Sequence, residues 1–203
     1  LSALDARVYS LPSDDPQVMA SFNNLGEIYC AQSRYSEAEA IHLKALEIRE
    51  DVLGHAKVDV ATSLNNLGML YVKQGRHKLA EPLCERAYEL SASVLGPEHR
   101  SVTACLNTLA IIHYDQRNWD KSEELFARVL AAELKETKPN STIIAGYLCN
   151  LASLAAAQGR LTEALADLNQ ALEAYKTTFG EDHPSVLSTR ASIEELHRRM
   201  GRT

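Results

Sequence analysis

Apolar residues in the second quarter of the chain follow two helical stripes with a short break between them. The first stripe runs over residues 58–74, with apolar residues on one helical face at Val60, Leu64, Leu67, Leu70 and Tyr71. Gly75 and Arg76 interrupt it, and a second stripe follows over residues 78–94 with Leu79, Leu83, Ala87, Leu90 and Val94. Gly96 and Pro97 end this second stripe. The pattern predicts two amphipathic helices of four to five turns joined by a tight turn.

The same scheme recurs with a period of 42 residues. Four segments share one column, namely Asn24-Leu25-Gly26, Asn66-Leu67-Gly68, Thr108-Leu109-Ala110 and Asn150-Leu151-Ala152. A fixed period of about 20 to 50 residues indicates stacked supersecondary units that bury their apolar faces against each other. We therefore expect an all-α fold with four helix-turn-helix repeats at about 16–54, 58–96, 100–138 and 142–180, a partial helix at 1–10 and a terminal capping helix at 184–200. Residues 1–203 form a single array in this interpretation, and the chain is expected to be part of a longer protein.

Particular residues are expected at the helix ends and crossings. Ser36 with Glu39, and Asp120 with Glu123, have the spacing of a capping box at the start of a second helix. His99 and His183 precede first helices, where we expect them to pack or hydrogen-bond at the turn between repeats. The small residues that follow the Leu column are expected where paired helices approach closely: Gly26, Gly68, Ala110 and Ala152.

These columns resemble the tetratricopeptide repeat. Leu25-Gly26-x-x-Tyr29 with Ala38, and Leu67-Gly68-x-x-Tyr71 with Ala80, match its pattern of Leu-Gly, Tyr and Ala. The 42-residue period, Asn65-Asn66-Leu67 and the segments 96–102 and 180–186, which share Gly-x-x-His-x-x-Val, are similar to the kinesin light chain and nephrocystin type. The resemblance implies a right-handed α-α superhelix, a tetratricopeptide solenoid in which the first helix of each pair lines a concave groove.

Composition and charge exclude several classes of function. The net charge is −6 and no basic stripe offsets it, which argues against a nucleic-acid partner. No apolar run approaches the roughly 18 residues of a membrane span, and no signal peptide is visible, so no membrane insertion is expected. The four cysteines lie far apart and form no C-x-x-C pair, as is typical of buried free thiols in a reducing compartment. The expected location is cytoplasmic.

Candidate chemistry is sparse. His99 and His183 occupy one column but lie two repeats apart, with four helix steps of roughly 8–10 Å between them, too far for a shared metal ion. The other histidines lack ligand spacing, and no Ser-His-Asp set, phosphate-binding glycine loop or H-E-x-x-H motif is present. We therefore expect no catalytic residue, no metal site, no cofactor and no enzymatic activity.

Two columns of asparagine need an explanation, because asparagine is a mediocre helix former whose side chain competes for backbone hydrogen bonds. One column holds Asn23, Asn65 and Asn107 with Cys149 as its exception, and the next holds Asn24, Asn66 and Asn150 with Thr108 as its exception. An amide can donate to and accept from the main chain of an extended peptide, so a column could line a binding groove. It could instead bond to neighbouring helices and fix the stacking. Adjacent helical residues point about 100° apart, so we expect one column to bind and the other to brace, in either assignment.

The resemblance also implies which residues face the groove. Carried over by position, the first helices offer Ala20, Asn23, Glu27 and Cys30, then Thr62, Asn65, Met69 and Lys73, then Ala104, Asn107, Ile111, Tyr114 and Asp115, then Gly146, Cys149, Ser153 and Ala156. The charges nearly cancel, which argues against electrostatic capture of an acidic tail. Trp119 shares a column with Tyr35 and His77 and is expected to pack at the helix turn. The predicted peptide-binding residues are Asn23, Asn24, Glu27, Asn65, Asn66, Met69, Lys73, Asn107, Thr108, Ile111, Tyr114, Asp115, Asn150 and Ser153.

The sequence thus favours an interaction scaffold that binds an extended or helical peptide segment of a partner protein, as cargo adaptors do. The ligand is expected to be neutral or mixed in charge, held by main-chain hydrogen bonds to asparagine and by apolar pockets. A second hypothesis is a structural spacer or self-association segment, whose groove is filled by its own chain or by a second copy. An enzyme would need polar groups from neighbouring repeats to converge on one pocket.

Overall fold

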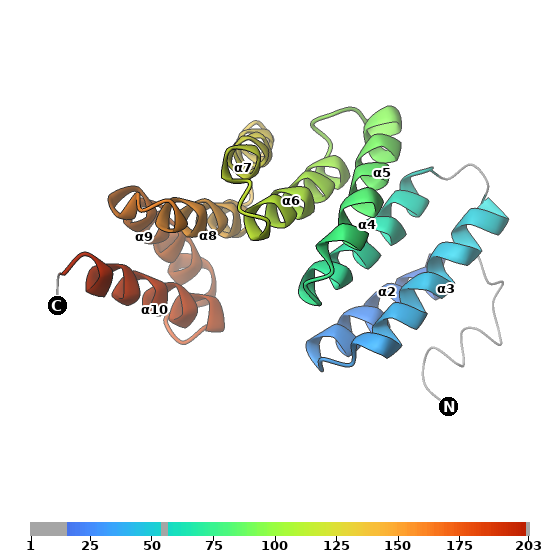
Figure 1. The fold of residues 1–203 in the computed structure, drawn as a ribbon, viewed down its shortest axis with the longest axis horizontal. Coiled ribbons are helices and arrows are strands. Elements are labelled where there is room, and N and C mark those ends of the chain that lie inside the picture. The colour runs from blue at the N-terminus through green and yellow to red at the C-terminus, as the bar shows by residue number, and fades with distance from the viewer. Residues whose placement is uncertain (1–15, 54–56, 202–203) are drawn as a thin grey trace. The chain divides into compact units, whose positions relative to one another are not determined.

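The fold is all-α over the residues that the computed structural model describes, 16–53 and 57–201, with side chains described for 18–50 and 57–201. The predicted partial helix at 1–10 lies outside these residues. The helices in chain order are α2 (Pro16–Ala31), α3 (Tyr35–Leu53), α4 (Lys57–Lys73), α5 (His77–Leu95), α6 (Arg100–Asp115), α7 (Trp119–Leu134), α8 (Ser141–Ala157), α9 (Leu161–Phe179) and α10 (Pro184–Arg199) (Figure 1).

The chain divides into two compact units, residues 1–112 and 113–203. The division falls inside α6, which is the first helix of the third predicted repeat. The first unit therefore holds α2 to α5 and most of α6, and the second holds the last turn of α6 and α7 to α10. Each unit is described by itself.

In the first unit, each helix packs against the next along the chain from α2 to α5. Val18, Met19 and Phe22 of α2 meet Ala45 and Ile48 of α3 in one apolar cluster. A second cluster joins three consecutive helices, with Val60, Ala61 and Leu64 from α4, Ala87 from α5 and Cys105 from α6. The helical stripes read from the sequence are therefore the faces that form the core.

The second unit repeats this arrangement with α8 packed between α7 and α9 and with α10 against α9. Ala152 and Ala155 of α8 meet Ala164 and Leu168 of α9 and Leu196 of α10. A neighbouring cluster joins Ala145, Leu148 and Ala171. Small residues dominate both clusters, so the backbones of α8 and α9 lie close together.

In the first two repeats, the two helices cross at the small column predicted from the sequence. An ideal Cβ on Gly26 would lie 2.4 Å from Cε1 of His42, and one on Gly68 would lie 2.3 Å from Sγ of Cys84. These distances are far below any real Cβ contact, so glycine is needed at both positions. The column of His42 and Cys84 on the second helices is buried in every repeat: His42, Cys84, Phe126 and Leu168.

Helix ends follow the predicted breaks. The turn inside each repeat passes through one residue of positive φ, at Ser33, Gly75, Arg117 and Gly159. Nδ1 of His99 accepts from the Ser101 backbone N–H at 3.1 Å, and Nδ1 of His183 accepts from that of Ser185 at 3.2 Å. The two histidines therefore cap α6 and α10, which confirms their expected role at the turns between repeats.

The fourth repeat starts differently. Asn140 caps α8 by accepting from the backbone N–H groups of Thr142 at 3.0 Å and Ile143 at 3.3 Å. The Glu133 carboxylate in turn accepts from the Asn140 backbone N–H at 3.0 Å, which fixes the loop before the cap. Pro184 occupies the first turn of α10, where a missing N–H costs least.

The predicted capping boxes are wrong. α3 begins at Tyr35 and α7 at Trp119, one residue before the expected capping residues Ser36 and Asp120. Asn118 occupies the cap of α7 without a side-chain bond to it. Glu39 and Glu123 instead reach the turn of the next repeat, as described below. Capping-box spacing in the sequence could not distinguish these two uses of a glutamate.

Gly68→Ala should destabilise the protein by about 1–3 kcal/mol, because the new methyl group collides with the Cys84 sulfur and an overpacked core must shift. Urea denaturation followed by circular dichroism measures the change. Adding Cys84→Ala should restore part of the loss, since it removes the colliding atom.

Gly146→Ala is the matched control within a first helix. Its Cβ would meet only Oη of Tyr175, at 3.6 Å, an ordinary contact. The gain in helix propensity should then stabilise the protein by about 0.5–1 kcal/mol. Equal effects of the two substitutions would mean that the crossing does not depend on glycine.

Candidate functional site

Ion pairs between repeats hold the first helices in place. In the first unit, Glu39 on α3 accepts from the Tyr71 hydroxyl at 2.8 Å and from Arg76 at 3.0 Å. The Arg76 guanidinium also lies 4.3 Å above the Tyr71 ring, a cation–π contact. Burial first, and then the hydrogen bond to Glu39, raises the pKa of Tyr71. The end of α4 is thereby tied to the preceding repeat.

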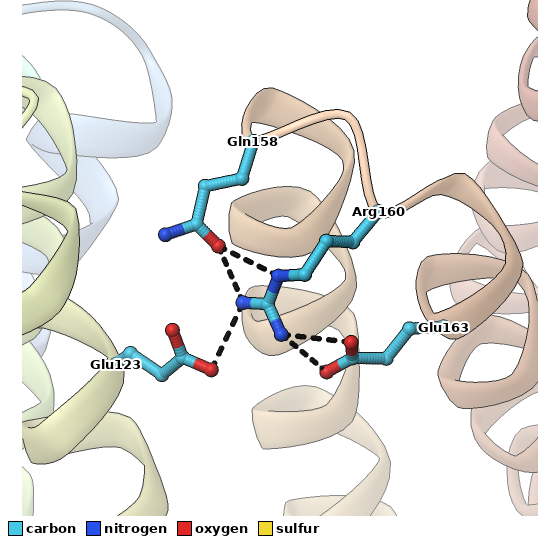
Figure 2. A network of polar contacts seen from close by, with 4 residues as sticks. All are labelled: Glu123, Gln158, Arg160 and Glu163. Atoms are coloured by element: carbon cyan, nitrogen blue, oxygen red, sulfur yellow. Dashed lines mark hydrogen bonds and ion pairs between the residues drawn. The ribbon is translucent and has the colours of Figure 1, made fainter.

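Arg160 makes the corresponding contacts in the second unit, two periods further along the chain (Figure 2). Its guanidinium donates to Glu123 of α7 at 2.9 Å and to both carboxylate oxygens of Glu163 at 2.7 Å. Nε donates to Gln158 at 2.9 Å. This network joins α7 to the turn between α8 and α9, so it orients α8, the helix that lines the hollow of this unit.

The asparagine columns in the first unit share one bond between helices. Nδ2 of Asn66, from the second column, donates to Oδ1 of Asn23, from the first, at 3.3 Å. This bond links α4 to α2 and therefore braces the stack. The buried Oδ1 of Asn65 has no hydrogen-bond partner, and Asn65 lines a hollow of about 170 Å³ with Thr62, Asn66 and residues of α5 and α6. Each column thus contributes one residue to the hydrogen bond between α2 and α4. The first column also contains an amide oxygen without a hydrogen-bond partner in the described residues.

A larger hollow of about 400 Å³ lies between α2, α3 and α4. Its rim carries the opposite charges of Glu27 and Lys73, and its walls include Met69 and Leu70. His42 contributes the wall from α3, and Cys30, Ala31 and Asn66 complete the lining. Four predicted site residues, Glu27, Asn66, Met69 and Lys73, are therefore brought together here.

His42 was missed as a site residue. Its side chain is 3 % exposed, and burial lowers its pKa below the ordinary value of 6.5. The imidazole is therefore neutral, and its Nδ1 has no hydrogen-bond partner. The 42-residue columns could have revealed His42, because the equivalent positions carry the weakly polar Cys84 and the apolar Phe126 and Leu168.

The second unit has a hollow of about 660 Å³ between α8 and α10, open beside the last turn of α6. Three predicted residues line it, Tyr114, Asn150 and Ser153. The α10 wall was not foreseen, because a terminal helix was expected to cap the array. It contributes Ser188, Thr189, Ala191, Ser192, Glu195, Leu196 and Arg199.

The remaining predicted site residues are placed as follows. Thr108 belongs to the core and not to the groove, since it is 1 % exposed and its hydroxyl donates to the Ala104 carbonyl at 3.2 Å. Asn24 and Asp115 are exposed, whereas Asn107 and Ile111 are half-buried. Asp115 and Tyr114 also line a smaller hollow with Trp119, the first residue of α7.

The buried thiols are not set up as nucleophiles. Burial raises the pKa of Cys84 to about 12 and that of Cys105 to about 11, so both remain protonated at neutral pH. The described residues contain no group of three or more His, Cys, Asp or Glu that could hold a metal ion. Within the same residues, no helix is long and apolar enough to cross a bilayer.

Comparison with known families gives a clear result. The tetratricopeptide repeat family model matches residues 17–83, 59–133 and 143–203, most of the chain. The chain belongs to the tetratricopeptide repeat family. A comparison with curated proteins gives no match.

Solved structures agree on the fold. BtubC (BKLC) from P. vanneervenii superposes with a TM-score of 0.78 at 19 % identity, over 100 % of this chain and 86 % of that one. A Podosopora anserina protein described as a candidate kinesin light chain with nearly identical TPR-like repeats gives 0.71 at 22 % identity, over 93 % and 89 % of the two chains. A Rap protein complexed with competence and sporulation factor gives 0.80 at 14 % identity, over 98 % of this chain and 53 % of that one.

These findings confirm a tetratricopeptide repeat protein whose fold is that of kinesin light chain-type repeats, and they confirm the all-α superhelical repeat class. Such repeats are generally protein-interaction scaffolds and generally lack enzymatic activity.

His42→Phe should reduce the acid sensitivity of folding. The pKa of His42 is lowered in the folded state, so below about pH 6.5 the unfolded chain takes up a proton that the folded chain does not. The stabilisation from the neutral ring is therefore complete above pH 6.5 and lost as the pH falls from there towards the folded pKa. Glu27 and Cys30 from α2, and Lys73 from α4, are the titratable groups that line the hollow with it.

Urea denaturation at pH 8 and pH 5 measures the effect. The wild-type protein should lose more free energy of unfolding between these values than His42→Phe, in which a ring of similar size replaces the imidazole. The same loss in both proteins would assign the acid sensitivity to other groups.

Proposed function

We propose that this protein binds a peptide segment of a partner protein along the first helices of its repeats, without catalysis of its own. The observation that carries this proposal is the hollow of about 170 Å³ between α4 and α6 that the Asn65 amide lines. Oδ1 of Asn65 is sealed from solvent, whereas its Nδ2 group is not among the sealed atoms and can donate to a carbonyl of a peptide main chain.

The side chains around the hollows support a neutral or mixed ligand. Glu27 and Lys73 balance each other in the first unit, and Glu195 and Arg199 do so in the second. Ser153, Thr189 and Ser192 line the second hollow, and their hydroxyls donate to carbonyls of their own helices, so they can accept from the N–H groups of a peptide main chain. The solved Rap protein complexed with competence and sporulation factor supports the proposal as a precedent for a ligand on this fold.

The finer parts of the proposal are an adaptor or cargo-binding role and a cytoplasmic location. Both rest on the resemblance to kinesin light chains and on the composition of the chain. The proposed partners are proteins or peptides, and the net charge of −6 makes nucleic acid a poor partner.

Self-association is the second candidate, and one observation favours it. Ile28 on α2 is 51 % exposed, whereas Leu70, its equivalent one repeat later, is 1 % exposed. Leu70 lies on α4, which packs against α3 of the preceding repeat. A second copy of the chain, or a segment of its own chain, could cover the exposed face of α2 in a similar way.

Asn65→Ala combined with Asn107→Ala should weaken peptide binding at least about tenfold. Two lost hydrogen bonds to a ligand, each contributing about 0.5–1.5 kcal/mol, account for that magnitude. Peptides selected from a random displayed library against the wild-type protein provide the ligands, and isothermal titration calorimetry measures affinity.

Asn66→Ala is the matched comparison, since it removes the bond to Asn23 and should lower stability. If the Asn65/Asn107 double variant melts early and keeps its affinity, the first column braces the stack instead. Failure to select any peptide, together with a mass that rises with concentration in sedimentation analysis, would favour self-association.

Ser153→Leu should block the hollow of the second unit. Ser153 is exposed on α8 and donates only to the Cys149 carbonyl of its own helix, so leucine fills the hollow without disturbing the core. Peptides that occupy the second unit should lose at least about tenfold in affinity, measured by calorimetry. Unchanged affinity for every selected peptide would restrict binding to the first unit.

A further inference from the structure

The His42 side chain is the least explained buried polar group in the first unit. Only 3 % of it is exposed, and it makes no hydrogen bond within the described residues 18–50 and 57–201. Buried polar groups in native proteins nearly always have a partner, and each exception calls for an explanation. At the equivalent positions the stack accepts Cys84, Phe126 and Leu168, so packing alone does not require an imidazole.

The two ring nitrogens differ in their surroundings. Nδ1 is sealed from solvent and has no hydrogen-bond partner. Nε2 also makes no hydrogen bond, but it is not sealed from solvent. An ideal Cβ on Gly26 would lie 2.6 Å from Nε2, so any side chain at position 26 would collide with this atom. His42 lines the 400 Å³ hollow, and Nε2 is therefore the nitrogen that can reach its contents.

The protonation of the ring follows from this difference. A buried N–H group without a partner is rarer and costlier than an unused lone pair, so the proton belongs on Nε2. His42 then presents one N–H donor to the hollow. A group that fills the hollow should carry an acceptor at its tip.

The rest of the lining restricts the occupant further. Met69 and Leu70 form apolar walls, and a methionine sulfur favours contact with an aromatic ring. Glu27 and Lys73 have opposite charges and make no ion pair with any residue in the described part of the chain. The rim of the hollow therefore favours neither a positively nor a negatively charged ligand group. A volume of about 400 Å³ lies within the range of small-ligand sites, roughly 300–1,000 Å³, and is ample for one aromatic side chain.

We propose that this hollow is a specificity pocket for a tyrosine side chain of the bound peptide, with the phenolic oxygen accepting from Nε2–H of His42. Tyrosine combines an aromatic body with a tip that accepts and donates. Its own O–H can then donate to the unpaired Glu27 carboxylate. Phenylalanine has no tip group, and the tryptophan N–H can only donate, so both leave the His42 donor without a partner.

This proposal rests on the proposed function, since it names one side chain of the ligand, but a single-residue probe tests it separately. The probes are N-acetyl-L-tyrosinamide and N-acetyl-L-phenylalaninamide, titrated against the whole chain and followed by NMR. The tyrosine amide should bind about five- to tenfold more tightly, the contribution of one hydrogen bond. It should also shift the His42 imidazole nitrogen and Met69 methyl signals, whereas the phenylalanine amide should leave the imidazole signal in place.

His42→Phe is the matched variant, and it should abolish the preference for tyrosine while keeping weak binding of both amides. Equal affinity for the two amides in the wild type, absence of binding by either, or a tyrosine preference that persists in His42→Phe would overturn the proposal. If His42→Phe fails to fold, the shift of the imidazole signal in the wild-type protein tests the proposal instead.

The two proposals can fail separately. If library peptides bind but the wild-type protein does not prefer the tyrosine amide, the tyrosine pocket is refuted and the proposed function stands. If the protein prefers the tyrosine amide but binds no peptide, the proposed function is refuted and the tyrosine pocket stands.

Discussion

The close crossing of the two helices in the first two repeats is the constraint on which the rest of the first unit depends. Gly26 and Gly68 leave no room for a side chain, because His42 and Cys84 occupy the space where a Cβ would lie. Only at that separation can the short core residues around the crossing, many of them alanine, fill the interior. The crossing therefore sets where the first helix lies, and with it the face that a partner can reach.

Contacts between repeats complete this arrangement with polar groups. Glu39 and Glu123 each hold an arginine at the turn of the following repeat, and the bond between Asn66 and Asn23 links successive first helices. Exposed ion pairs contribute little to stability, so their main effect here is on orientation. The asparagines lower local helix propensity, and the bracing bond offsets part of that cost.

Two side chains of the first unit contain a buried polar atom without a hydrogen-bond partner in the described residues, Oδ1 in Asn65 and Nδ1 in His42. The two hollows that these side chains line differ in size and chemistry, with an amide in one and an imidazole in the other. In the proposals above, the Asn65 amide contacts the main chain of a peptide and Nε2–H of His42 contacts one of its side chains.

The sequence by itself determined the helices, their breaks and the crossing residues, because a 42-residue period repeats the same local physics four times. Helix starts were less certain, since Ser36 with Glu39 has capping-box spacing while tertiary contacts direct Glu39 to Tyr71 and Arg76. The groove could be predicted only in part. Glu27, Asn66, Met69 and Lys73 meet around one hollow, whereas Thr108 turns into the core and His42 enters from a second helix. Which member of a column faces a ligand depends on how neighbouring helices rotate and pack, and only the tertiary structure decides that.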